Sequence, residues 1–385
     1  MNISAPIVPW SDSYWPKYKG EISNRYADRG FPNSKDFEVN YQYFQANPPS
    51  GVVGSGNSAL IDNLSPAEKY DFVMGDSNFT LTNFAWMKGK QARDTGGVES
   101  WEGICHGWSG AAHMLQPFND HPVTVLAQNG TPVTFFSQDM KALLTMLWAN
   151  GSPTSRFVGN RCKIANPARN ANGRIIEPTC FDPNPATWHI AIANQFGINK
   201  RTFVIDATYD QQVWNHPLVS AKSRFFNPAT FEDMNSLESA TIPISTYRTD
   251  RFREFRSPSA TKIVGVYMDL TYVIEIEPGH SRVFDTPTKT IRLIYDLELD
   301  DSYNILGGEW YSNAHPDFMW TFERGAQALA FEDAIPMQDP WSNNTPVPLS
   351  WSQYAGKASA RGEPLYAFIK KVVDAAGNSV YVGPH

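Results

Sequence analysis

The sequence has only three cysteines in 385 residues, and only 18% of its residues are charged. So few cysteines exclude a small scaffold held by many disulfides, and an odd number in a secreted chain indicates one bridge and one free thiol. Acidic residues outnumber Lys and Arg, the formal net charge is −7, and no basic run or stripe occurs. Nucleic-acid binding is therefore not expected.

Long apolar runs are also missing, because no stretch approaches the ~18 consecutive apolar residues of a membrane-spanning helix. The N-terminus lacks the basic segment followed by an apolar one that marks a signal peptide. If the protein is secreted or held at the cell surface, as we expect, its signal was removed. Aromatic residues are plentiful instead, with 12 Trp, 16 Tyr and 23 Phe beside 28 Pro and 26 Gly. They indicate a core of buried rings joined by many loops.

The chain divides into three parts by composition. Residues 1–90 are polar, aromatic and interrupted by Pro and Gly, so we expect an irregular cover or arm, with a remnant pro-segment as the alternative. Residues 91–240 are the expected catalytic core, with helices predicted over 105–115 and 138–149 from apolar spacing. Residues 241–385 are expected to form a β-rich part packed on this core.

Two runs in the last part predict its sheet. Apolar residues alternate strictly over 266–276 and 291–299, which is typical of antiparallel strands with one buried face. Helices early in the chain and strands late predict an α+β fold.

The three cysteines are expected to have different roles. Cys162 and Cys180 bracket a loop rich in Asn and Pro that buries little and costs entropy to order. A bridge closing about 18 residues would offset roughly 3 kcal/mol of that cost. We predict this disulfide and a free Cys105, with a bridge from Cys105 in a latent form as the alternative.

Cys105 opens the first predicted helix, two residues after Gly103. A helix N-terminus offers unpaired N–H groups and partial positive charge, and both favour the nucleophilic thiolate. The plainer alternative is a buried cysteine at a helix start with no chemistry.

His189 and Asp206 suggest partners for this thiol. Short strands predicted at 188–194 and 203–206, joined as a hairpin, would place the two residues opposite each other, with Cβ atoms about 5 Å apart. The carboxylate would orient the imidazole, which would accept the proton of Cys105. A histidine that is simply satisfied within a strand is the alternative.

At this point the residues resemble a family. The order Cys105, His189 and then Asp206 in an Asp-Ala-Thr triplet is similar to the transglutaminase and papain-like superfamily. A closer resemblance is to the transglutaminase elicitor family of oomycetes and related bacterial proteins. It covers residues from about 95 to 320 and rests on these segments: Trp101 to Cys105, Val213-Trp214-Asn215-His216-Pro217, Gly308-Glu309-Trp310-Tyr311 and His315-Pro316-Asp317.

The resemblance implies a papain/transglutaminase-like core and an acyltransferase. Cys105 would be the nucleophile, His189 the general base and acid, and Asp206 the orienting carboxylate. The implied enzyme is a protein-glutamine γ-glutamyltransferase that forms a thioester with a glutamine side chain and passes it to a primary amine. Its partners would be proteins carrying glutamine and lysine. The oxyanion would be held by the Cys105 N–H and by a side-chain donor, for which Trp101 is the candidate.

Two rival functions use the same residues. A papain-like cysteine peptidase or a deamidase would share the triad with water as the acceptor, but residues 97–100 lack the glutamine that papain-like peptidases place before the cysteine. A non-enzymatic surface or elicitor protein would keep the triad as a vestige. The family's exposed peptide, which plants recognise, has glutamine where this chain has His216, and residues after Pro217 differ. Recognition by a plant receptor is therefore not expected.

No cofactor is required for this chemistry, and no zinc-ligand spacing surrounds Cys105. Animal transglutaminases need calcium, so the resemblance leaves calcium open. The acidic residues Asp296, Glu298, Asp300 and Asp301 lack a calcium-loop pattern, and we expect them to form a solvated strand end.

Overall fold

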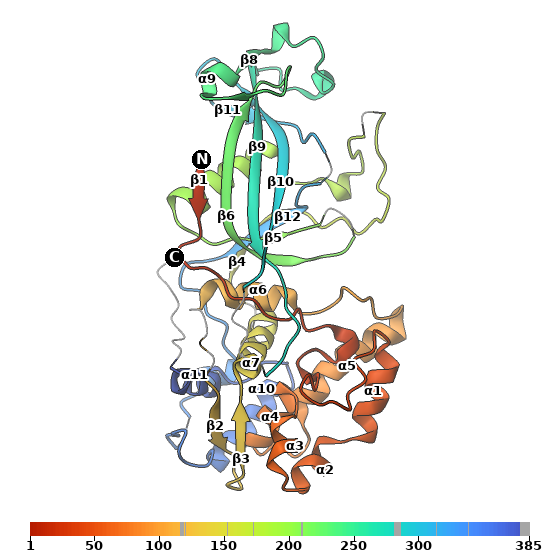
Figure 1. Ribbon diagram of the computed structural model, residues 1–385, viewed down its shortest axis with the longest axis vertical. Helices are drawn as coiled ribbons and strands as arrows, with labels where there is room; N and C mark the ends of the chain where they lie inside the picture. The colour runs from red at the N-terminus through yellow and green to blue at the C-terminus, as the bar shows by residue number, and fades with distance from the viewer. Residues whose placement is uncertain are drawn as a thin grey trace.

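The computed structural model describes residues 1–115, 119, 121–151, 153–171, 173–208, 211–280, 286–312, 314–337 and 339–377. The molecule is elongated, with a tall sheet at one end and a group of helices at the other (Figure 1). Helix α6 lies where the two meet. Within the described residues, no helix has the length and apolar character needed to cross a membrane.

The first 95 residues are mostly helical. After the short strand β1 (Asn2–Ser4) and two 3-10 turns come α1 (Phe37–Ala46), α2 (Pro49–Gly54), α3 (Ser58–Asp62), α4 (Pro66–Val73) and α5 (Thr80–Thr95). The prediction of an irregular cover is wrong for residues 37–95, whereas residues 5–36 hold only two 3-10 turns between irregular segments. Local capping explains part of the difference, because Ser65 and Glu68 form a reciprocal capping box at the start of α4.

Helices α6 (Cys105–Met114) and α7 (Ser137–Asn150) confirm the two predicted helices. They pack closely because Gly107 has no side chain, and a Cβ there would lie 2.1 Å from the Thr145 carbonyl oxygen. The hairpin of β2 (Val123–Leu126) and β3 (Pro132–Phe135) and the late helices α10 (Ser352–Ser359) and α11 (Tyr366–Ala375) complete the helical end. The last part of the chain is therefore not wholly β.

One antiparallel sheet forms the other end of the molecule. Its path runs β11-β10-β9-β6-β5-β12-β4. The bounds are β4 (Ser155–Gly159), β5 (Val204–Asp206), β6 (Asn215–Phe226), β9 (Lys262–Val273), β10 (Thr288–Leu299), β11 (Ile305–Gly307) and β12 (Phe318–Phe322), with β7 (Asp233–Met234), β8 (Ile242–Pro243) and the short helix α9 (Leu237–Ala240) beside it.

Strands β9 and β10 confirm the two alternating runs. Val266, Met268, Leu270 and Tyr272 are all buried on one face of β9. The sheet contains strands from before and after residue 240, so the expected boundary between parts at residue 240 divides a single sheet.

The predicted strand at 188–194 is wrong. Residues Pro185–Ala191 form α8, and Ile192–Ile198 continue it as a π-helical turn. Asn184 caps α8. A strand pattern and a helix pattern both place Trp188 and Ile192 on the buried face. They differ at Ile190, which a strand would bury and which is 39% exposed here.

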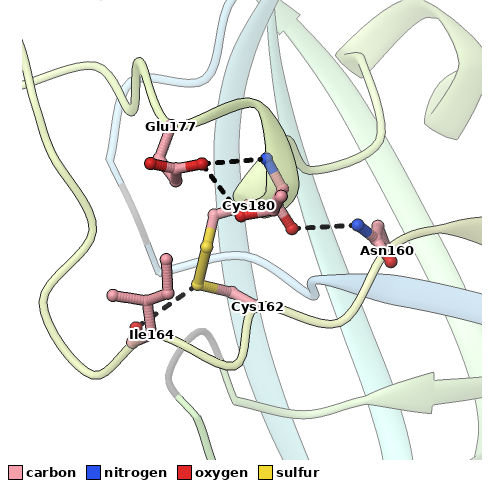
Figure 2. Close-up of a disulfide and its surroundings, with 6 residues drawn as sticks. Asn160, Cys162, Ile164, Glu177 and Cys180 are labelled. Atoms are coloured by element: carbon pink, nitrogen blue, oxygen red, sulfur yellow. Dashed lines mark hydrogen bonds between the residues drawn. A yellow bond between two sulfur atoms is a disulfide. The ribbon is translucent and has the colours of Figure 1, made fainter.

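The predicted disulfide between Cys162 and Cys180 is confirmed, with their Cα atoms 4.4 Å apart (Figure 2). Asn160 donates to the Thr179 carbonyl oxygen beside it. Cys105 is the free cysteine, as predicted.

Candidate active site

The N-terminal segment of the chain hydrogen-bonds to the backbone next to Cys105. The backbone N–H of Ile104, the residue before it, donates to the Tyr14 carbonyl oxygen at 2.8 Å. Gly103 allows this close crossing, because a Cβ there would lie 2.3 Å from the same oxygen. The thiol begins α6 but is only 5% exposed.

Two paired strands bring polar groups to the sulfur. Asn215, at the start of β6, donates from Nδ2 to the Cys105 Sγ at 3.5 Å, and the Val213 carbonyl oxygen lies 3.8 Å from it. Asn215 pairs across the ladder with Asp206, the last residue of β5. Asp206 Oδ1 accepts from the Trp214 backbone N–H at 2.9 Å. The structure therefore brings Cys105 and Asp206 into one neighbourhood, with Asn215 between them.

These surroundings set the charge state of the thiol. Burial is the largest influence and raises the pKa of Cys105. Hydrogen bonds from Asn215 lower that pKa, while the negative charges of Asp206 and Glu275 raise it. The resting group is therefore a neutral thiol, and Asn215 supplies the donors that favour the thiolate.

Trp320 on β12 fixes which end of the Asn215 amide faces the sulfur. Its indole Nε1–H donates to Asn215 Oδ1 at 2.8 Å. An indole N–H can only donate, so the amide oxygen must face Trp320 and the NH₂ group must face Cys105. Sequence reasoning gave no role to Trp320, and it named Asn215 only as part of the elicitor-like segment.

His189 lies in a different part of the molecule. On α8 its Nδ1 is 2.7 Å from the Tyr295 hydroxyl of β10, and burial lowers the pKa of the imidazole to about 4. Tyr295 lies across the sheet from Val266, which lies across from Phe225.

The register of the sheet gives the separation of His189 from the thiol. Phe225 is ten residues beyond Asn215 on β6, roughly 30 Å along an extended strand. The structure therefore does not bring His189 to Cys105, and the predicted pairing of His189 with Asp206 is wrong. Strand β5, which carries Asp206, pairs with β6 and β12. It forms no hairpin with residues 188–194.

His216 follows Asn215 on β6. Its Nδ1 lies 2.9 Å from the Val273 carbonyl oxygen and 3.7 Å from Glu275. Its ring packs edge-on against Trp108 of α6, with the ring centroids 5.9 Å apart, so it lies beside the helix that Cys105 begins. In the described parts of the chain, no histidine hydrogen-bonds to the Cys105 thiol.

The other predicted site residues lie as follows. Trp101 is half-buried, and the Arg161 guanidinium lies 5.4 Å from its ring centroid. The segment that resembles the exposed plant-recognised peptide is not exposed. Val213 and Trp214 are half-buried, and Asn215 to Leu218 are buried in β6, where Pro217 pairs with Val204.

The acidic strand end is only partly solvated. Asp296 and Glu298 are buried, and both are paired with the Arg256 guanidinium, so that expectation is wrong for them. Asp300 is half-buried and Asp301 is exposed. Among the described residues, no group of three or more His, Cys, Asp or Glu side chains is arranged to hold a metal ion.

Comparison with known proteins identifies the family and the fold. The transglutaminase elicitor family model matches residues 2–331. The chain belongs to this family. Its fold is similar to the crystal structure of the GP42 transglutaminase from Phytophthora sojae, with a TM-score of 0.54 and 21% sequence identity over 93% of this chain and 91% of that one. No curated protein matches the sequence.

Proposed function

We propose that this member of the transglutaminase elicitor family is a protein-glutamine γ-glutamyltransferase that works through Cys105. One observation carries the proposal. The chain's free cysteine begins a helix, and Asp206 and Asn215 converge on it from two paired strands. Thiol acyl transfer needs a cysteine whose neighbours favour its thiolate, and the Asn215 amide is such a neighbour.

The reaction would proceed in two steps. The Cys105 sulfur attacks the γ-carboxamide carbon of a glutamine, a C–S bond forms, and the C–N bond breaks. Ammonia leaves with the proton that the thiol gave up. A lysine side chain or another primary amine then attacks the thioester carbon, the isopeptide C–N bond forms, the C–S bond breaks, and the sulfur takes the proton that the amine gives up.

Asn215 is the donor that we assign to the sulfur and to the oxyanion. Its NH₂ group is already aimed at Sγ by Trp320, so no reorientation is needed when charge develops. The Cys105 backbone N–H, at the first position of α6, has no partner within its helix and is the second donor. Asn215 replaces Trp101 in this role.

The geometry does not support the predicted triad as the route by which the proton leaves the Cys105 thiol. Strands β5 and β6 bring the Asp206 carboxylate close to the thiol. We propose that it orients the groups around Cys105. Measured along the sheet, His189 lies roughly 30 Å from Cys105. We therefore expect the His189→Ala variant to retain crosslinking activity.

The closed setting of Cys105 favours transfer over hydrolysis. The thiol is 5% exposed, and a thioester shielded from water survives until an amine arrives. The Cys162–Cys180 bridge favours secretion or a cell-surface location, since disulfides persist in oxidising compartments. Proteins carrying glutamine and lysine are the proposed partners.

The test is incorporation of a labelled primary amine into casein by the wild-type chain and by the Cys105→Ala, Asp206→Asn and His189→Ala variants. Each is assayed with calcium and with a chelator. We expect incorporation by wild type and His189→Ala, none by Cys105→Ala and little by Asp206→Asn. The chelator arm decides whether calcium is needed.

Three side measurements separate the rival functions. Ammonia release without amine incorporation would identify a deamidase. Cleavage of casein lost in Cys105→Ala would identify a peptidase. If wild type and Cys105→Ala are equally silent in every assay while both are folded by circular dichroism, the catalytic proposal is wrong and the family fold serves a non-enzymatic role.

A further inference from the structure

A cavity of about 620 Å³ lies at the far end of the sheet from Cys105. Its walls come from three segments: residues 173–185 near the disulfide, 251–255, and 308–312 with His315. The third contains the family-like Gly308-Glu309-Trp310-Tyr311 segment, which the proposed chemistry does not use. Glu309 sits beside Asp296 of β10, so the cavity shares the end of the sheet where His189 lies.

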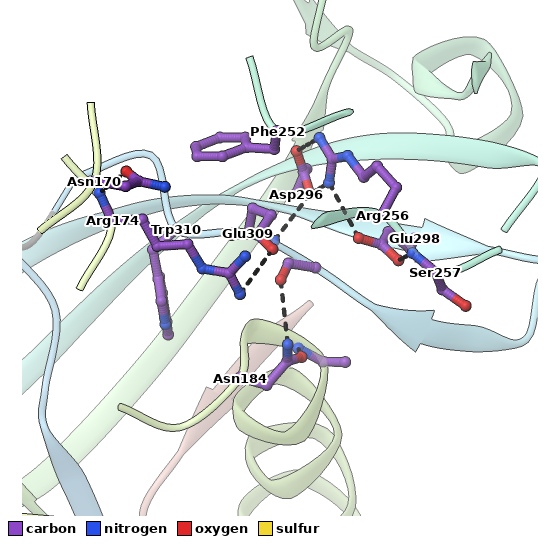
Figure 3. Close-up of polar contacts among 12 residues, drawn as sticks. Asn170, Arg174, Asn184, Phe252, Arg256, Ser257, Asp296, Glu298, Glu309 and Trp310 are labelled. Atoms are coloured by element: carbon purple, nitrogen blue, oxygen red, sulfur yellow. Dashed lines mark hydrogen bonds and ion pairs between the residues drawn. The ribbon is translucent and has the colours of Figure 1, made fainter. Parts of the chain in front are cut away.

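The polar groups of this cavity balance in charge. Arg174 reaches Glu309 at 3.3 Å (Figure 3), and His315 Nε2 lies 3.5 Å from Asp182 Oδ2. Burial raises the pKa of both carboxyl groups to about 7 and lowers that of His315 to about 4. With Arg251 also in the wall, two guanidinium groups face two carboxyl groups and a neutral imidazole, and the charges balance above about pH 7, where both carboxyl groups are ionised. In that pH range a ligand with a large net charge of either sign gains no overall attraction.

Aromatic rings supply the apolar surface of this cavity. Phe252, Phe255, Trp310 and Tyr311 line the interior, and Phe181 stands at the wall next to the disulfide. Phe181 is 53% exposed and Ile176, in the same wall, is 51% exposed. Such side chains gathered at a cavity mark a contact surface rather than a core.

The geometry points to a binding site for a neutral oligosaccharide, and this inference does not rest on the proposed acyl transfer. A sugar ring offers a C–H face that packs on an aromatic ring, and hydroxyl groups that donate to carboxylates and accept from guanidinium groups. Asp182 and Glu309 supply the acceptors, Arg174 and Arg251 the donors, and Phe181 the stacking surface. No net charge is needed on the ligand, which agrees with the balanced wall.

The experiment uses the full chain carrying Cys105→Ala, so binding is measured without catalysis. Hexasaccharides of β-1,4-glucose, β-1,3-glucose, N-acetylglucosamine and mannose are tested one by one by calorimetry and by saturation-transfer NMR. A further variant adds Phe181→Ala, which removes an exposed ring. The matched control adds Phe331→Ala, since Phe331 is 74% exposed and does not line the cavity.

We expect at least one hexasaccharide to bind in the millimolar range or tighter. Phe181→Ala should weaken it about tenfold, while Phe331→Ala should leave it unchanged. The proposal is overturned if none of the four sugars binds, or if both phenylalanine variants weaken binding equally. Binding of the diamine cadaverine in place of the sugars would also overturn it, because that result assigns the cavity to cations. Amine incorporation by the wild-type chain is independent of every one of these outcomes.

Discussion

Replacing Trp320 with phenylalanine should make Cys105 less reactive without touching it. The indole N–H fixes the Asn215 amide through a 2.8 Å hydrogen bond, and the amide NH₂ group reaches the sulfur at 3.5 Å. Phenylalanine keeps most of the buried surface but removes the donor. The amide oxygen then either stays buried without its partner, or the amide turns and presents oxygen to the sulfur.

The magnitude follows from the second outcome. A hydrogen bond to a charged group contributes about 1.5–3 kcal/mol, and each 1.4 kcal/mol is a factor of ten. The thiolate of the Trp320→Phe variant should therefore be roughly 10- to 100-fold less populated at neutral pH. Alkylation of Cys105 by iodoacetamide should slow by the same factor, and the midpoint of its pH profile should move up.

Intact-mass spectrometry measures this rate directly, because Cys105 is the free cysteine of a chain with three. The matched control is Trp341→Phe. Trp341 is also a buried indole that donates at 2.9 Å, to the Thr345 carbonyl oxygen away from Cys105. The control should lose similar stability with an unchanged alkylation profile. A Trp320→Phe profile that coincides with wild type would refute the reasoning.

Other predictions concern the framework around the site. Lys69 and Asp139 form a fully buried ion pair at 2.7 Å, so Lys69→Met should leave a buried charge unpaired and lower the unfolding free energy in urea by about 3–5 kcal/mol. Replacing both Cys162 and Cys180 with alanine should cost about 3 kcal/mol in the same assay, in line with the loop that the bridge closes. The pKa of buried Glu21 is raised to about 7 by desolvation, so the folded state binds its proton more tightly than the unfolded chain does. Stability should therefore fall by roughly 3 kcal/mol as pH rises from about 4.5 to 7, and Glu21→Gln should flatten that fall.

Local pattern in the sequence determined several features. Apolar spacing gave α6 and α7, and strict alternation gave β9 and β10, because each element has a single buried face whose period appears in the chain. The Cys162–Cys180 bridge and the free Cys105 followed from loop composition and an odd number of thiols. Family-specific residues around Cys105 and Val213 were enough to indicate the family.

The tertiary structure decided the partners of Cys105. Trp188 and Ile192 satisfy both alternation and helical spacing, so a short segment did not reveal that His189 lies on a helix at the other end of the sheet. Asp206 pairs with Asn215 rather than with residue 189, because β5 takes β6 and β12 as neighbours. Trp320 reaches Asn215 across more than a hundred residues of chain. Such contacts depend on strand order and register, which bring distant residues together and leave no local period in the sequence.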